Sequence, residues 1–172
     1  MGAWVSYGLG SESRNMPAFV VLTSYSKPAS LVGPSLWTNG FLSSSYRGVA
    51  FRSKGEPILH LENPVGVNDA FQRVRLDAVR RLNALRMAET RDREISSRIA
   101  SYELAYRMQA EAPGLLDFSD ESAATLELYG LNDKTTQWYG TNCLLARRMI
   151  ERGVRFVQLF HSGQPWDNHK NL

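Results

Sequence analysis

Cysteine, lysine and long apolar runs are scarce in this sequence, and each shortage excludes a class of protein or site. Cysteine occurs once in 172 residues, at Cys143, which excludes an internal disulfide and a zinc site built from several thiolates. No apolar run approaches the roughly 20 residues that cross a bilayer. The N-terminus has no basic segment followed by an apolar one, as a secretory signal has. We therefore expect neither a membrane span nor a signal peptide in these residues.

Lysine accounts for four of the 20 basic residues, and arginine for the rest. The guanidinium group donates hydrogen bonds in pairs and suits planar oxyanions such as carboxylate, phosphate and sulfate. Acidic residues are mixed with the arginines between Asn68 and Glu111, which is typical of a solvated surface crossed by ion pairs. A continuous basic face is not expected, and nucleic acid is therefore not expected as a partner.

Common catalytic and nucleotide-binding motifs are also missing. Neither Gly-x-Ser-x-Gly nor the phosphate-binding loop Gly-x-x-x-x-Gly-Lys occurs. The segment "GLGSES" at Gly8 has the glycines of a dinucleotide motif, but it precedes the first predicted strand instead of following it. Cys143 lies on the apolar face of a predicted helix, where a thiol lacks the electropositive, exposed setting of a nucleophile. We predict a core role for it.

What is present is the composition of one globular domain with a hydrophobic core, 43% hydrophobic and 22% charged. Two apolar, β-branched runs predict strands buried on both faces, at Pro17–Ser24 and Val154–Phe160. Between them we predict a long ordered loop over 25–57, rich in Ser, Gly and Pro, and a short strand near 57–64. The order of helix, Gly turn and strand before Phe160 is half of an α/β crossover unit.

Helical periodicity predicts a pair of helices over 68–111. The first begins at Asn68 or Asp69, ends near Thr90 and carries an apolar stripe made of Phe71, Val74, Ala78, Leu82 and Leu85. The second begins near Asp92 and is predicted to stop at the segment "APG", residues 112–114, because proline and glycine disfavour a helix interior.

A further helix precedes the second strand and is predicted to end at Gly153. Its periodicity predicts an apolar face of Tyr139, Cys143, Ala146 and Ile150, and a polar face of Arg147, Arg148, Glu151 and Arg152. At the start of the chain, the apolar segment that ends at Gly8 or Gly10 is typical of the tail of a helix.

Three side chains with metal-binding groups follow the second strand: His161, Asp167 and His169. Open α/β sheets bind their ligands beyond the carboxyl ends of the strands, and imidazole nitrogen and carboxylate oxygen are ordinary ligands of zinc, manganese and iron. In an extended segment Asp167 and His169 lie on the same side, because alternate residues share a face. The pattern predicts a divalent metal site, with zinc as one candidate.

The residues alone leave alternatives open. Two ligands are fewer than the three that a catalytic zinc takes from the protein, so Asp167 and His169 also fit a polar surface turn. His161 either joins them or caps the end of the strand. His60 lies in an apolar run with no neighbouring ligand residues, which is typical of a structural histidine with satisfied hydrogen bonds.

Six ordered segments carry a resemblance that spans nearly the whole chain. They read "MGAWVSYGLGSE", "MPAFVVL", "GFLSSSYRGVAFRS", "RIASYELAYRMQ", "NCLLARRMIERGVRFVQLFHSG" and "WDNHKN". Together they resemble the bacterial family called domain of unknown function 1501, which is similar to the alkaline phosphatase and sulfatase superfamily. The resemblance implies a doubly wound α/β fold with a mostly parallel sheet, of which this chain holds a part, together with a helical insertion.

The resemblance also implies a function. Asp167 and His169 match the family's Trp-Asp-x-His motif, and by analogy with the superfamily they would bind one metal of a two-metal site. Such a pair of metals polarises a phosphate or sulfate ester, which makes an anionic ester the substrate expected of the intact protein. His161 matches a neighbouring position, and the resemblance assigns it no role.

Members of the family are longer at both ends, so the resemblance implies that the nucleophile and further ligands lie outside residues 1–172. We therefore expect one incomplete α/β domain, made of the loop over 25–57, the helical pair over 68–111, and a helix, a strand and a metal-motif loop over 136–172. In isolation we expect it to be inactive and to self-associate through uncovered sheet edges. The family resemblance implies an exported, periplasmic protein.

Two other functions stay open. In the first, the chain is a non-catalytic module whose arginine-rich helices present Arg73, Arg80 and Arg81 to an anionic polymer or to another protein. In the second, it is a stand-alone domain in which the metal motif has decayed. Replacing Asp167 and His169 would then change neither stability nor metal content.

Overall fold

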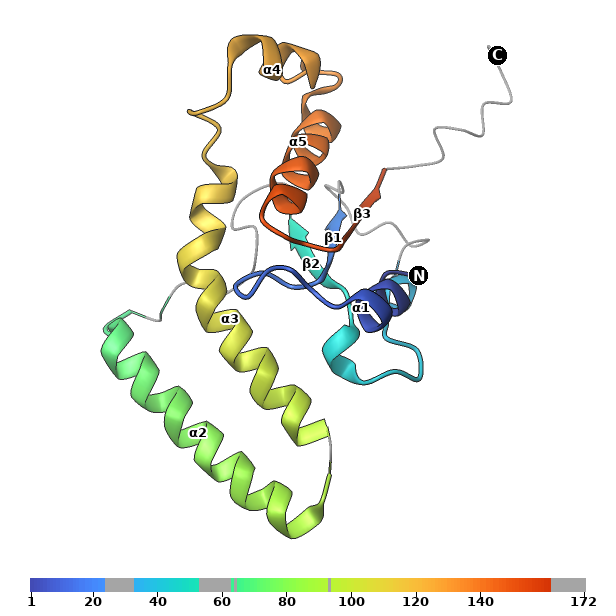
Figure 1. Ribbon diagram of the computed structural model, residues 1–172. Helices are drawn as coiled ribbons and strands as arrows, with labels where there is room; N and C mark the ends of the chain where they lie inside the picture. The colour runs from blue at the N-terminus through green and yellow to red at the C-terminus, as the bar shows by residue number, and fades with distance from the viewer. Residues whose placement is uncertain (24–32, 53–62, 64, 93, 162–172) are drawn as a thin grey trace.

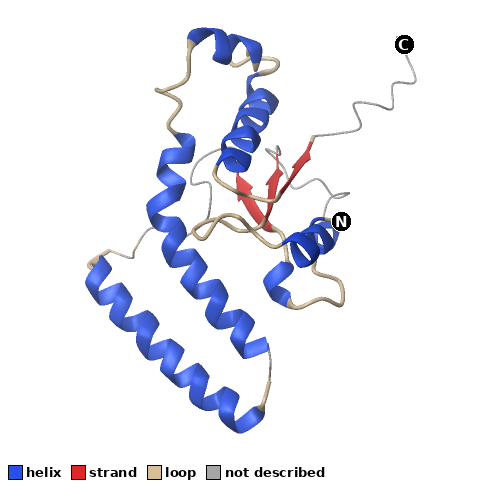
Figure 2. Cartoon of the chain, in the orientation of Figure 1, coloured by secondary structure: helices blue, strands red, loops and turns tan. Residues whose placement is uncertain are grey.

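Three parallel strands form the centre of the fold. The computed structural model describes residues 1–23, 33–52, 63, 65–92 and 94–161. Strand β1 (Phe19–Thr23) lies between β2 (Val49–Arg52) and β3 (Phe156–Phe160), which gives the order β2-β1-β3 (Figure 2). All pairings of β1 are parallel. The prediction of an α/β fold with a parallel sheet is confirmed for this part of the chain.

The apolar sequence of β1 divides between the two faces of the sheet, because successive side chains point in opposite directions. Val20 and Leu22 belong to one buried cluster, whereas Phe19 and Val21 belong to another. All four side chains are buried, as expected of a central parallel strand. The predicted strand at Pro17–Ser24 is therefore confirmed, with both of its faces covered.

Helices lie on both faces of the sheet (Figure 1). On the face of Val20 and Leu22, α3 (Glu94–Leu116) and α5 (Gln137–Glu151) supply the buried residues Met108, Leu115, Leu145 and Met149. On the other face lies α1 (Gly2–Leu9), where the ring of Phe19 approaches Gly2 so closely that a Cβ atom there would lie 2.6 Å from it. Gly10, with φ of 68°, ends α1 as predicted.

Two predictions about strands need correction. The range 25–57, predicted as a loop, contains β2 and two 3-10 helices, Pro34–Trp37 and Ser44–Tyr46. β2 was missed because its four residues are too few to show a periodicity, and pairing with β1 makes it a strand. β3 was predicted to be buried on both faces, but its five residues are half-buried, since in the described residues it pairs with β1 alone. The strand predicted near 57–64 lies outside the described residues, apart from Asn63.

Helix α2 (Asp69–Thr90) begins where it was predicted to begin. The Oδ1 atom of Asn68 accepts a hydrogen bond of 2.8 Å from the amide of Phe71, which caps the helix. Together α2 and α3 form a long hairpin that extends away from the sheet (Figure 1). The predicted apolar stripe does not pack on α3: its large members, Phe71, Val74, Leu82 and Leu85, are exposed.

Helix α3 continues beyond the predicted stop. It passes through Pro113 and Gly114 and ends at Leu116. Its last turns are held by tertiary packing, because Ala112 and Leu115 are buried and the Gly114 carbonyl accepts a hydrogen bond of 3.0 Å from Arg148. These contacts outweigh the cost of a proline inside a helix, about 3 kcal/mol.

Helix α5 is confirmed, but its buried face differs from the predicted one. Leu144, Leu145 and Met149 face the core, while Ile150, predicted on the apolar face, is exposed. Arg148, predicted on the polar face, is buried. Between α3 and α5 lies the short helix α4 (Ala123–Leu128), which the sequence did not predict.

Gly153 lies between α5 and β3, and its φ of 85° allows the turn through which the chain enters β3. A Cβ atom at this position would lie 2.8 Å from the backbone nitrogen of Ser13, so glycine is required for the backbone angle and for the close approach. In the part of the chain that the structure describes, no helix combines the length and apolar character needed to cross a membrane.

Candidate functional site

The carboxyl ends of the three strands meet at one edge of the sheet, because all three are parallel. Thr23, the last residue of β1, pairs with Arg52 at the end of β2 and with Phe160 at the end of β3. In the order β2-β1-β3, the strand that follows β1 in sequence, β2, pairs on one side of β1, and the later strand β3 pairs on its other side. Such a reversal between β1 and β3 is where open α/β sheets bind ligands.

His161 lies at this edge, directly after the last residue of β3. Its imidazole packs against the side chains of Trp138 and Tyr139, with ring centroids 4.7 Å and 5.2 Å away. The ring centroids of Trp138 and Tyr139 lie 5.7 Å apart, and the ring planes meet at 66°. Three aromatic rings from the first turn of α5 and the end of β3 thus form one cluster, which fixes His161 beside the carboxyl edge of the sheet.

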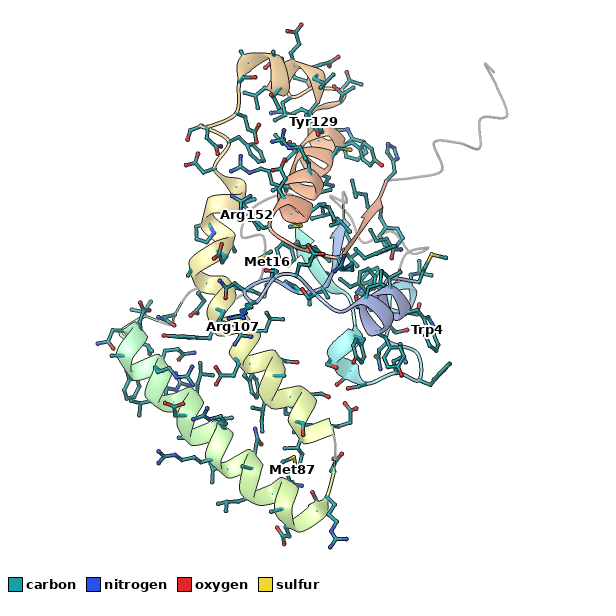
Figure 3. All side chains as sticks on the ribbon, in the orientation of Figure 1. Trp4, Met16, Met87, Arg107, Tyr129 and Arg152 are labelled. Atoms are coloured by element: carbon teal, nitrogen blue, oxygen red, sulfur yellow. The ribbon has the colours of Figure 1, made fainter. Side chains whose placement is uncertain are left out.

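A hollow of about 330 Å³ opens beside this cluster. Its wall includes Tyr129, Thr135, Thr136, Cys143 and the three clustered rings, and no Asp, Glu, Lys or Arg lines it in the part of the chain that the structure describes. In volume it lies at the lower end of the range of small-molecule sites. Figure 3 shows Tyr129 near the top of the view beside α5, whereas Trp4 lies on α1 at the right of the view.

The wall of the hollow is held by short contacts between the segment after α4 and the start of α5. The Oγ1 atom of Thr136 donates a hydrogen bond of 2.8 Å to the Gly130 carbonyl, and the indole Nε1–H of Trp138 donates one of 2.8 Å to the Thr135 carbonyl. At Gly140 the backbones approach so closely that a Cβ atom would lie 1.9 Å from the Tyr129 carbonyl oxygen. Glycine at position 140 therefore allows this wall to form.

Arg148 holds the same helix from its other side. Its guanidinium, with 4% of the side chain exposed, donates to Asp120 Oδ1 at 2.7 Å and to Glu121 Oε1 at 2.8 Å. Arg147 also contacts Glu121. Hydrogen bonds from Arg147, and then from Arg148, lower the pKa of the Glu121 carboxyl, and a hydrogen bond from Arg148 lowers the pKa of Asp120. These groups are neutralised by one another and tie α5 to the segment before α4.

Cys143 is half-buried and lines the hollow. Burial raises the pKa of its thiol above the ordinary value, because the thiolate is less well solvated there than in water. The thiolate is the nucleophilic form, so the setting of Cys143 disfavours a nucleophile. The core role predicted for Cys143 needs correction, because its side chain is half-buried and lines the hollow.

The predicted metal ligands are only partly within the described residues. His161 is described, whereas Asp167, His169 and the structural candidate His60 lie outside. Among the described residues no group of three His, Cys, Asp or Glu side chains is placed to hold a metal ion. His161 is thus the one predicted ligand whose surroundings are known, and it stands at the carboxyl edge where a ligand is expected.

The arginines singled out in the sequence are partly engaged in ion pairs. Arg73 contacts Asp77 at 2.6 Å and Glu103 at 2.9 Å, which joins α2 to α3. Arg80 contacts Asp77 at 3.4 Å. The hydrogen bond from Arg73 lowers the pKa of both carboxyls. The prediction of a surface crossed by ion pairs is confirmed for these residues.

Sequence reasoning did not single out Trp138, and it placed Tyr139 only on the apolar face of a helix. The signal that could have found them is two adjacent aromatic residues in the first turn of a helix that leads into a strand of a parallel sheet. The first turn of such a helix lies at the same edge as the carboxyl end of the strand. Trp138 and Tyr139 are accordingly neighbours of His161 although 22 or more positions separate them in the chain.

Comparison with known proteins gives a family but no function. A family model described as "Protein of unknown function (DUF1501)" matches residues 1–172. The comparison with curated proteins and the comparison with solved structures gave no match. The resemblance of the six ordered segments is thereby confirmed at the level of the family.

Proposed function

The chain belongs to the DUF1501 family, and we propose that it is part of a metal-dependent hydrolase of phosphate or sulfate esters. In this proposal Asp167 and His169 bind a divalent metal, with zinc as the first candidate, and His161 is a possible third ligand or a neighbour of the site. The fold proposed for the intact protein is that of the alkaline phosphatase and sulfatase superfamily, in which the three described strands are part of a larger parallel sheet.

One observation carries the proposal: His161 stands at the carboxyl edge of β3, beside the strand-order reversal next to β1. Asp167 and His169 follow His161 by six and eight positions in the sequence. The proposal is supported because His161, the described member of the motif, lies at the edge where α/β proteins bind their ligands.

The donor set suits zinc in kind, because two imidazoles and a carboxylate offer nitrogen and oxygen ligands. A metal held there would polarise an ester oxygen and stabilise charge on the attacking and leaving oxygens. Three ligands at most are fewer than a two-metal site requires. We therefore propose that residues 1–172 bind metal weakly and hydrolyse no ester without the further groups that the family resemblance implies.

Zinc titration followed by calorimetry tests the ligands. We expect one zinc ion to bind to the chain, and Asp167→Ala and His169→Ala each to weaken binding at least tenfold. His60→Ala is the matched control, because it removes an imidazole that the proposal does not use. Zinc binding by the Asp167→Ala and His169→Ala variants that equals the binding by the unsubstituted chain would support a decayed motif instead. Saturable zinc-dependent turnover of an aryl phosphate or sulfate by the chain would overturn its proposed inactivity.

We also propose self-association through the sheet. Within the described residues β2 and β3 each pair with β1 alone, so each presents one side of its backbone for pairing with a further strand. Sedimentation velocity over a hundredfold range of protein concentration tests this. We expect the average mass to rise with concentration, and a constant monomer mass would contradict it.

The alternative of an anion-binding module stays a prediction. Arg73 and Arg80 are engaged with carboxylates, and an anionic polymer would have to compete with these contacts. Retention of the chain on heparin that disappears at moderate salt would favour the module. No observation on the described residues favours it over the hydrolase.

A further inference from the structure

We propose that the hollow beside His161 binds a neutral sugar ring, the alcohol part of the ester whose phosphate or sulfate group the metal site would take. The inference rests on the proposed function for the role of the ring, but the binding itself needs no metal. Its evidence is the chemistry of the wall, its volume and its position at the edge of the sheet.

Three aromatic side chains line the hollow. Trp138, Tyr139 and His161 are each half-buried and pack on one another at centroid distances of 4.7 to 5.7 Å. Mutual packing of this kind holds the rings in place before a ligand arrives, so little conformational entropy is lost on binding. A sugar ring presents C–H groups on its flat face, and such a face packs well on an indole or a phenol ring.

Four of the residues that line the hollow carry hydroxyl groups. Tyr129, Thr135, Thr136 and Tyr139 all line the hollow, and a hydroxyl both donates and accepts hydrogen bonds. The hydroxyl of Thr136 already donates to the Gly130 carbonyl and can still accept. An aryl ring would use the aromatic wall alone, whereas a sugar ring uses both the aromatic wall and the hydroxyl groups.

The lack of charged residues among the described lining residues restricts the chemical class of ligand that the hollow can bind. Among the described residues that line the hollow there is no Lys or Arg to bind an anion and no Asp or Glu to bind a cation. The charged part of an ester would therefore lie outside the hollow and its neutral part inside. The volume of about 330 Å³ suits one ring better than a chain of several.

The position of the hollow joins it to the proposed site. His161 forms part of its wall and is also the first residue after β3, at the carboxyl edge. A ring bound against Trp138 and His161 therefore lies beside the residue that precedes the proposed metal ligands in the sequence by six and eight positions. This is the relation expected between a site for the alcohol part of a substrate and a site for its charged group.

Nuclear magnetic resonance of the tryptophan indole N–H groups tests the inference. The chain has four tryptophans, and the Trp138 signal is assigned by its loss in Trp138→Phe. On titration with methyl glucoside we expect a saturable shift of the Trp138 signal and less than a third of that shift at Trp4. Sorbitol, a linear polyol, is the control for effects of hydroxyl groups in solution. No shift at Trp138, or an equal shift with sorbitol, would overturn the inference.

Two variants make the test specific. Trp138→Ala removes the largest aromatic face, and we expect saturation transfer from protein to methyl glucoside to fall at least fivefold. Trp4→Ala changes a residue of α1 that does not line the hollow, and it should leave that transfer unchanged. A shift of Trp138 with phenol but none with methyl glucoside would also overturn the inference, since it would assign the hollow to an aryl ring.

The inference and the proposed function fail in different ways. Sugar binding by a chain that binds no zinc would support the sugar site in the hollow and contradict the proposed metal-dependent hydrolase. Zinc binding that depends on Asp167 and His169, without sugar binding, would keep the hydrolase and remove the sugar site.

Discussion

The imidazole of His161 and the indole of Trp138 lie 4.7 Å apart, centroid to centroid. This contact joins the end of β3 to the first turn of α5, and it sets the one described histidine at the carboxyl edge of the sheet. Both the proposed metal site and the proposed sugar site depend on this edge. The edge exists only if the core and the contacts of α5 stabilise the fold, and substitutions at these positions test that stabilisation.

Gly140→Ala should destabilise the chain by at least about 1–3 kcal/mol, the usual cost of overpacking. The added Cβ atom would lie 1.9 Å from the Tyr129 carbonyl oxygen, so the backbone on one side must move. Urea denaturation measures the change. Gly114→Ala is the matched control, because it adds the same methyl group in α3 where nothing lies within 4 Å, and it should stabilise the chain by about 0.5–1 kcal/mol. Equal effects of the two substitutions would contradict the close approach.

Leu145→Ala should cost about 2–5 kcal/mol of unfolding free energy, since Leu145 is 2% exposed and belongs to the main core cluster. Leu82→Ala removes the same atoms from α2, where Leu82 is 66% exposed. It should change stability by no more than about 0.5 kcal/mol. A loss at Leu82 as large as the loss at Leu145 would show that the α2 stripe is covered, for example by another copy of the chain.

Arg148→Ala should destabilise the chain by about 3 kcal/mol or more. It leaves the half-buried Glu121 without its buried partner and removes the link from α5 to the Gly114 carbonyl. Arg80→Ala provides the comparison, because Arg80 is 54% exposed and its contact with Asp77 spans 3.4 Å. A surface pair of this kind contributes about 0–1 kcal/mol. A loss in Arg148→Ala that is as small as that of a surface pair, about 0–1 kcal/mol, would rule out a structural role for the buried guanidinium.

Acid should weaken the fold through Glu121. Hydrogen bonds from Arg147 and Arg148 hold its pKa in the folded chain below the ordinary value of 4.5, so the ionised form is favoured by folding. The resulting stability is present above about pH 4.5 and is lost as the pH falls through the lowered folded pKa. We expect the urea midpoint to fall over this acidic range. The Glu121→Gln variant should show a shallower fall, and an identical pH dependence would refute the assignment to Glu121.

The sequence predicts the elements whose own residues decide their structure. The apolar run of β1, the Asn68 cap of α2 and the Gly153 turn before β3 are each determined by local chemistry, and each was predicted. β2 and the last turns of α3 were not, because pairing with β1 makes Val49–Arg52 a strand and burial of Leu115 carries α3 past Pro113. Contacts between distant segments decided these cases, and a single sequence does not show such contacts.

The buried face of α5 is likewise decided by contacts with a distant segment. Arg148 reads as a polar-face residue from its charge, yet its side chain is 4% exposed because Asp120 and Glu121 neutralise it. The positions of these acids are set by the turn after α3, which no periodicity reveals. In the candidate site, the place of His161 after a parallel strand could be predicted from sequence. Its packing against Trp138 and Tyr139 could not, since it depends on how α5 lies against the sheet.

The most direct test of the account is to follow the side chains of the three histidines by ¹H–¹⁵N magnetic resonance during a titration with zinc. His60, His161 and His169 are the only histidines in the chain, so each imidazole can be assigned by a single substitution. The proposed function predicts that zinc shifts the His169 signals, that Asp167→Ala weakens this response at least tenfold, and that His60 does not respond. Zinc that leaves His169 unchanged, or that acts equally on the Asp167→Ala variant, would contradict a metal site at the carboxyl edge of the sheet.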